Sequence, residues 1–203
     1  SQSGGALRLD GVLRVQGDWT NAASGPVFNS SSSGSVDLTG VGQRIFGATI
    51  FPSLTKVVTN ADSLSFAPGS TNGTTVSGVL RLRGASGQRL SLRSTVPGSQ
   101  WLLTSNGARD IAYLDVQDSD NASAQAINLT GTGSLNSGNN TNWRFGYLVT
   151  FGSSGDGIVS GVNPQDAYVG GSTTAVTAVP DVGYTFSGWS GSGGFSSSAN
   201  PLV

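Results

Sequence analysis

Short apolar-polar-apolar alternations, separated by glycine, asparagine or serine, run through the chain from its start to about residue 145. Leu80-Arg81-Leu82-Arg83, Leu90-Ser91-Leu92-Arg93 and Leu114-Asp115-Val116 are examples. Successive side chains of a β-strand point to opposite faces, so this period of two predicts strands with one buried and one solvated face. No segment shows the sustained 3.6-residue apolar stripe of an amphipathic helix. We therefore expect an all-β protein.

The composition supports strands and excludes several kinds of chemistry. All 11 acidic residues are Asp and Lys56 is the single lysine, so two good helix formers are almost absent. The chain has no His and no Cys, which excludes Ser-His-Asp and Cys-His catalysis and zinc sites built on those ligands. A net charge of −1 argues against nucleic acid as a partner. No apolar run approaches the about 20 residues of a membrane helix, so no membrane insertion is expected.

Two architectures accommodate many short strands: a sandwich and a solenoid. A sandwich requires tight hairpins, for which Asp10-Gly11, Asn72-Gly73 and Asn106-Gly107 are candidates. A solenoid requires bent corners rich in Gly, Asn and Ser and a repeated apolar-polar-apolar rung, and the chain fits this pattern better. We predict a right-handed parallel β-helix over residues 1–145, with about six or seven coils of roughly 20–25 residues each. Leu82, Leu92 and Leu114 are predicted to point inward.

The pattern changes near residue 146. The later strands are closer together and richer in aromatic residues, as in Tyr147-Leu148-Val149-Thr150-Phe151 and Gly183-Tyr184-Thr185-Phe186-Ser187-Gly188-Trp189. We therefore expect a second module over residues 146–203.

This second segment resembles the divergent InlB B-repeat family of bacterial surface proteins. The resemblance is carried by Phe151, Gly157-Ile158-Val159-Ser160-Gly161, Gly170-Gly171-Ser172, Ala178-Val179-Pro180, Gly183 to Gly191 and Asn200-Pro201-Leu202. It implies a small β-grasp-like all-β module that serves as a spacer or adhesive repeat. Family members continue past the Asn-Pro-Leu with further strands, so this module is expected to lack its last strand.

The first segment is similar to the parallel β-helix regions of large bacterial surface proteins. The similar stretches are Val15 to Asn21, Phe51-Pro52-Ser53-Leu54, Leu90 to Ser94, Pro97 to Trp101, Tyr113 to Ser119 and Asn142-Trp143-Arg144-Phe145. Together, the two resemblances imply a secreted, non-enzymatic structural or adhesive segment, a stalk or adhesin, at the cell surface or outside the cell. The expected partners are other copies of the chain, flanking domains, and glycans or other cell-surface ligands.

Asp115, Asp118 and Asp120 form the densest group of carboxylates. Paired carboxylates hydrolyse glycosides when one is protonated and the other ionised, and carboxylate oxygens also bind calcium. A role in turns and caps is the favoured interpretation. No cofactor is expected, with calcium as the alternative, and a polysaccharide-active enzyme is the alternative function.

Arg81, Arg83, Arg89 and Arg93 all fall on the polar phase of two neighbouring strands. They predict a solvated face with Asp partners, and a site for an acidic or sulfated glycan is the alternative. Trp19, Trp101, Trp143 and Trp189 are able to stack on a sugar ring, although core packing is favoured for Trp143 and Trp189.

The ends of a β-helix expose unpaired strand edges, which pair with other chains unless they are capped. Only residues 1–5, which we expect to be flexible, precede the first alternation at Leu7. We therefore predict that a strand from a neighbouring subunit completes these edges in an extracellular filament, or that flanking sequence does so.

Overall fold

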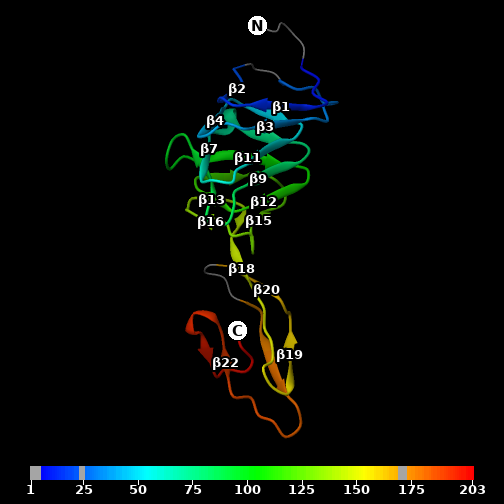
Figure 1. Ribbon diagram of the computed structural model, residues 1–203, viewed down its shortest axis with the longest axis vertical. Coiled ribbons are helices and arrows are strands. Elements are labelled where there is room, and N and C mark those ends of the chain that lie inside the picture. Colours follow the sequence, from blue (N-terminus) through cyan, green and yellow to red (C-terminus); the bar gives the residue numbers. More distant parts are fainter. Residues whose placement is uncertain (1–5, 23–25, 169–172) are drawn as a thin grey trace. The chain divides into compact units, whose positions relative to one another are not determined.

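The computed structural model describes residues 6–22, 26–168 and 173–203, and these residues confirm the all-β prediction. The structure is 45% strand and only 3% helix. Among the described residues, the helical part consists of two short 3₁₀ turns, η1 (Ser70–Asn72) and η2 (Ser192–Gly194). No helix in the described ranges is long and apolar enough to cross a membrane. The chain divides into two compact units, Ser1–Phe145 and Gly146–Val203 (Figure 1).

The first unit is a parallel β-solenoid with three sheets (Figure 1). The first sheet contains β1 (Val12–Val15), β3 (Ser35–Leu38), β6 (Leu54–Val57), β9 (Leu80–Arg83) and β12 (Arg109–Ala112). The second contains β2 (Trp19–Thr20), β4 (Gln43–Phe46), β7 (Asp62–Phe66), β10 (Leu90–Ser94), β13 (Leu114–Val116) and β16 (Leu135–Asn136). The third contains β5 (Thr49–Phe51), β8 (Thr74–Val76), β11 (Trp101–Ser105) and β14 (Ser119–Asn121). From β3 to β14 the chain visits the three sheets in turn, so each of these coils adds one strand to each sheet.

The solenoid has about four turns, so the prediction of six or seven coils is wrong. Coils are longer than predicted where the corners are wide, as at η1 between β7 and β8. The residues after β14 add only the two-residue pair of β15 (Ile127–Asn128) and β17 (Trp143–Arg144) and the short β16. At about 4.8 Å per rung, four turns correspond to about 19 Å of solenoid.

Because the strands pair in parallel and in register, the inward apolar residues of one coil lie on the inward apolar residues of the next. Leu64 pairs with Leu92 and Leu92 with Val116, and all three side chains are fully buried. Leu82, Leu92 and Leu114 are likewise fully buried, which confirms their predicted inward orientation. Each such side chain contributes about 1.5–3 kcal/mol of hydrophobic stabilisation.

Aromatic side chains fill the wider parts of the solenoid interior. Trp101 is fully buried and stacks on Phe66, with ring centroids 4.0 Å apart. Trp19 packs between Phe28 and Phe51, at centroid distances of 5.8 and 5.1 Å. The expected core packing of Trp143 is also found: it is 9% exposed and its indole N–H donates a 3.0 Å hydrogen bond to Ser119 Oγ.

The candidate hairpin turns lie at corners of the solenoid. Asn106-Gly107, for example, links β11 of the third sheet to β12 of the first, and these two strands are not paired with each other. A Cβ on Gly107 would lie 2.1 Å from the carbonyl oxygen of Gly78 on the preceding coil. The corners are therefore rich in glycine because successive coils approach closely there, and the sandwich alternative is wrong.

The second unit consists of antiparallel pairs in the part of the chain that the structure describes. The elements are β18 (Gly146–Val149) with β20 (Gln165–Tyr168), β19 (Gly157–Gly161) with β21 (Val176–Pro180), and β22 (Trp189–Ser190) with β23 (Ser196–Ser197). Leu202 forms an antiparallel bridge to Val176, whose side chain is fully buried. The expectations for residues 1–5 and for Gly170-Gly171-Ser172 lie outside the described residues.

Candidate functional site

The three predicted carboxylates lie on two sheets and the corner between them. Asp115 points outward from β13, where Arg93 Nη2 lies 2.5 Å from one oxygen and the Ser137 hydroxyl donates a 2.5 Å hydrogen bond to the other. Asp120 lies on β14, in the next sheet.

Asp118 occupies the corner itself, with a φ of 56°, and is only 3% exposed. Its carboxylate accepts a 3.0 Å hydrogen bond from the Gly98 amide and a 2.7 Å hydrogen bond from Asn139 Nδ2. Asp118 thus joins three successive coils at one corner. In the described ranges, no three acidic side chains gather as they would around a metal ion.

The four predicted arginines are divided between two sheets and contact the coils that follow them. Arg81 and Arg83 extend from β9 and both pair with Asp110 on β12, the Arg81 contact being 3.0 Å. Arg93 extends from β10 to Asp115. Arg89 Nε donates a 2.9 Å hydrogen bond to the carbonyl oxygen of Gly133. The Asp partners expected of a solvated face are therefore present for three of the four arginines.

A buried ionic cluster in the solenoid lies outside the set of residues predicted from the sequence. Lys56 is fully buried, in the inward file that also contains Leu82 on the next rung. Its ammonium group lies 2.9 Å from Asp62 Oδ2 and donates hydrogen bonds to the Gly40 carbonyl (2.7 Å) and Gln43 Oε1 (3.1 Å). The sequence feature that indicates this cluster is the position of Lys56, which falls where the alternation of Leu54-Thr55-Lys56 places a buried residue.

The Asp62 carboxylate is stabilised in its ionised form. Burial alone would raise its pKa, but the Lys56 contact and the amides of Gly42 (2.8 Å) and Ser63 (2.7 Å) outweigh burial and hold the pKa below its usual value. Every group of this cluster is bound to another part of the solenoid, so the cluster joins β4, β6 and β7 and has a structural role.

Arg109 binds the segment that follows β14 to the preceding coil through hydrogen bonds. Its guanidinium donates hydrogen bonds to the carbonyl oxygens of Ser105 (3.0 Å), Gln125 (3.2 Å) and Ala126 (3.0 Å). Burial lowers its pKa from the usual value.

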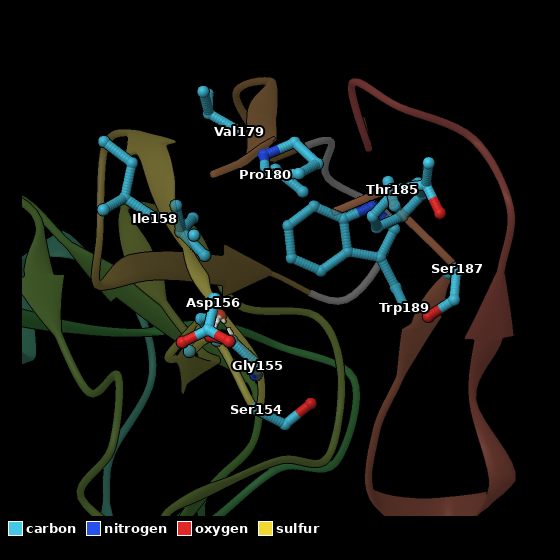
Figure 2. A pocket seen from close by; sticks show the side chains of 16 residues that line it. Ser154, Gly155, Asp156, Ile158, Val179, Pro180, Thr185, Ser187 and Trp189 are labelled. Carbon is cyan, nitrogen blue, oxygen red and sulfur yellow. Dashed lines mark hydrogen bonds between the residues drawn. The ribbon is translucent and has the colours of Figure 1, made fainter. Parts of the chain in front are cut away.

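A pocket of about 190 Å³ lies in the second unit (Figure 2). It is formed by the loop 152–156, by β19 and β21, and by the segment 185–189. Figure 2 shows the indole of Trp189 directed into the pocket, toward the side where Asp156 and Ile158 lie.

Trp189 is held in this position by its own contacts. Its indole N–H donates a 2.9 Å hydrogen bond to the Ala199 carbonyl. Its ring packs against Phe186 and Phe151, with centroids 5.5 and 6.0 Å away. The side chain is only half-buried, unlike Trp101 and Trp143 in the solenoid, so core packing does not account for all of its surface.

The rest of the pocket lining combines apolar residues of β19 and β21, among them Ile158, Val179 and Pro180, with a polar loop. Ser153 shapes the loop by donating a 2.7 Å hydrogen bond to the carbonyl of Gly155. The side chains of Ser154, Asp156 and Ser187 are exposed at the pocket, and Asp156 is the one charged residue among those that line it.

The sequence comparisons concern this second unit. Residues 147–203 match the family model of the divergent InlB B-repeat domain, which covers less than a third of the chain. Neither the curated proteins nor the solved structures contain a match to the chain. The resemblance predicted for this segment is therefore confirmed, and the chain combines a parallel β-solenoid with an InlB B-repeat-like segment.

Proposed function

We propose that this chain is a non-enzymatic structural and adhesive segment of an extracellular bacterial surface protein. The observation that carries the proposal is the combination of a parallel solenoid with a segment that matches the InlB B-repeat family, whose domains occur in surface proteins. The solenoid acts as a stalk, and the second unit acts as a spacer or adhesive module.

The side chains of the solenoid support a stalk. Most of its inward positions are filled by buried apolar residues, and many outward charged groups bind the adjacent coil, as Arg81 and Arg83 bind Asp110. Asp115 and Asp118 are likewise bound by protein donors, whereas a glycosidase needs two carboxylates free to flank a substrate bond. These contacts favour a mechanical role over a catalytic one.

The strand edges support association with other polypeptide segments. Among the described strands, β1, β2 and β5 are the outermost members of their sheets at one end of the solenoid. Val12 on β1 is 58% exposed. Outermost strands offer backbone amides and carbonyls to an added strand. We propose that another copy of the chain, or a flanking domain, pairs with these edges.

Antibodies against the 203-residue chain test the surface location. They should label intact cells of the source organism, and labelling confined to permeabilised cells would contradict the proposal. Light scattering tests self-association: mass should rise with concentration, and a monomer at all concentrations would exclude assembly of this chain through its own edges.

An assay against a panel of neutral and acidic glycans tests the absence of enzymatic activity. We expect no turnover by the unaltered chain. If the unaltered chain turns over a glycan and Asp115→Asn or Asp118→Asn abolishes this activity, the chain is a polysaccharide-active enzyme and the proposal of a stalk is wrong.

A further inference from the structure

The pocket of the second unit presents an aromatic surface and a polar surface to the same small volume. The indole of Trp189 lies near Pro180, and Ser154 and Asp156 belong to the loop across the pocket (Figure 2). We infer that this pocket binds one neutral sugar residue of a glycan, with its ring against Trp189. This inference rests on the adhesive role proposed above and supplies the chemistry of the ligand.

A pyranose ring matches both surfaces. Its C–H faces are apolar and suit the broad indole, while its hydroxyl groups donate and accept hydrogen bonds around the rim. Asp156 accepts hydrogen bonds only, and the serine hydroxyls both donate and accept. Trp189 is already fixed by Ala199, Phe186 and Phe151, so little side-chain freedom is lost when a ligand binds.

The size and charge of the pocket limit the class of ligand that it can bind. A volume of about 190 Å³ is below the roughly 300–1,000 Å³ of pockets for drug-sized ligands, which favours one sugar unit. Asp156 repels an anionic sugar, and the lining contains no Lys or Arg to offset that repulsion. A quaternary ammonium group would also suit an aromatic ring beside a carboxylate. It cannot use the hydroxyls of Ser154 and Ser187, so the neutral sugar is the better match.

Ligand-observed NMR and tryptophan fluorescence with the full chain test the inference. The probes are the methyl glycosides of glucose, galactose, mannose and N-acetylglucosamine, with choline as the cationic comparison. We expect saturable binding of at least one neutral glycoside with a Kd of about 1–10 mM, the weak range of a single small contact. Trp189→Leu should weaken that binding at least about tenfold, the effect of losing roughly 1.4 kcal/mol.

Two further variants separate binding from folding. Tyr147→Leu is the matched control, because Tyr147 is a 72% exposed aromatic residue of the same unit that does not line the pocket. It should leave the affinity unchanged. Asp156→Asn alters an exposed side chain and should raise the affinity for methyl glucuronide relative to methyl glucoside by about threefold or more. A loss of fold does not produce such a change in selectivity.

The inference is overturned if no glycoside saturates, if choline binds and the glycosides do not, or if Trp189→Leu and Tyr147→Leu have equal effects. A chain that labels intact cells but binds no glycoside would refute the sugar site and leave the surface role standing. A chain that binds a glycoside but is absent from the cell surface would refute the role and leave the site.

Discussion

Replacing Lys56 by methionine tests how the solenoid accommodates a charge in its interior. Lys56→Met keeps an unbranched apolar stem but removes the ammonium group that contacts Asp62, the Gly40 carbonyl and Gln43 Oε1. The side chain of Asp62 is only 6% exposed, so its carboxylate is left charged and buried without its partner. Removing one member of a buried ion pair typically costs about 3–5 kcal/mol. We expect a loss of that size in the free energy of unfolding, measured by urea denaturation at pH 7.

The double variant shows whether the loss comes from the orphaned charge. Lys56→Met with Asp62→Asn removes both charges and keeps an oxygen that accepts from the Gly42 and Ser63 amides, and removing both charges of a buried pair is often close to neutral. Gly40 and Gln43 still lose a donor, so we expect the double variant to lie within about 2 kcal/mol of the unaltered chain. Arg81→Met is the matched control, because the Arg81–Asp110 pair is half-exposed and should contribute about 1 kcal/mol or less. Additive single-variant losses at Lys56 and Asp62 would refute the argument, because residues in contact should be coupled.

The pH dependence follows from the lowered pKa of Asp62. A carboxylate whose pKa is lower in the folded state than its unfolded value near 3.8 contributes stability that is fully present above that value. This contribution is lost as the pH falls through the folded pKa, because the proton then binds the folded state as well. Between pH 7 and pH 2, the free energy of unfolding of the unaltered chain should therefore fall more than that of Asp62→Asn, which has no carboxylate at position 62 to protonate.

Three other substitutions test the register and corners of the solenoid. Leu92→Asp places an unpaired charge at a fully buried position and should cost at least about 4 kcal/mol or unfold the solenoid. Thr75→Asp, on the outward phase of β8 with Ile50 and Thr104 as its register partners, should cost less than about 1 kcal/mol. Equal melting temperatures of the two variants would mean that the register is wrong. Gly107→Ala should lower the melting temperature, because its Cβ would lie 2.1 Å from the Gly78 oxygen, and an unchanged value would refute the close approach of these coils. Asp118→Ala removes the acceptor for the Gly98 amide and Asn139 and should cost about 1–3 kcal/mol in urea denaturation, with no cost expected if water replaces the carboxylate.

The alternation of the sequence predicts which side chains of a strand point inward, but not which strands lie beside it. Whether Leu92 points inward is decided by residues next to it, and the prediction for Leu82, Leu92 and Leu114 is confirmed. The number of coils depends on the lengths of the corners, which vary from one coil to the next. Register partners on successive coils are 18 residues apart for Val36 and Leu54 but 29 for Leu80 and Arg109, and the residues after β14 form only two-residue strands, so one uniform repeat applied to all 145 residues gave too many coils.

The sequence predicts that the arginines pair with Asp residues, but it does not predict which Asp residue each arginine contacts. Arg81 and Arg83 were expected to have Asp partners, but only the pairing of β9 with β12 identifies that partner as Asp110. Lys56 was visible as a charge in an apolar phase, yet its stabilisation depends on Gln43 and Asp62, which come from different strands. For Trp189, the surrounding motif favoured core packing, and only the fold shows that the ring is half-buried beside a polar loop.

The two units place their aromatic residues in different surroundings, and this contrast bears on where a ligand binds. In the solenoid, Trp101 and Trp143 are buried, and their indole N–H groups donate hydrogen bonds to residues of the adjacent coil. Exposing either ring to a ligand would require the coil around it to open, which costs part of the cooperative stability of the repeat. In the second unit, the Trp189 N–H is bound to Ala199 while part of the ring remains open to the pocket. A ligand can contact this ring without breaking a hydrogen bond of the fold, so recognition is expected in the second unit and mechanical support in the first.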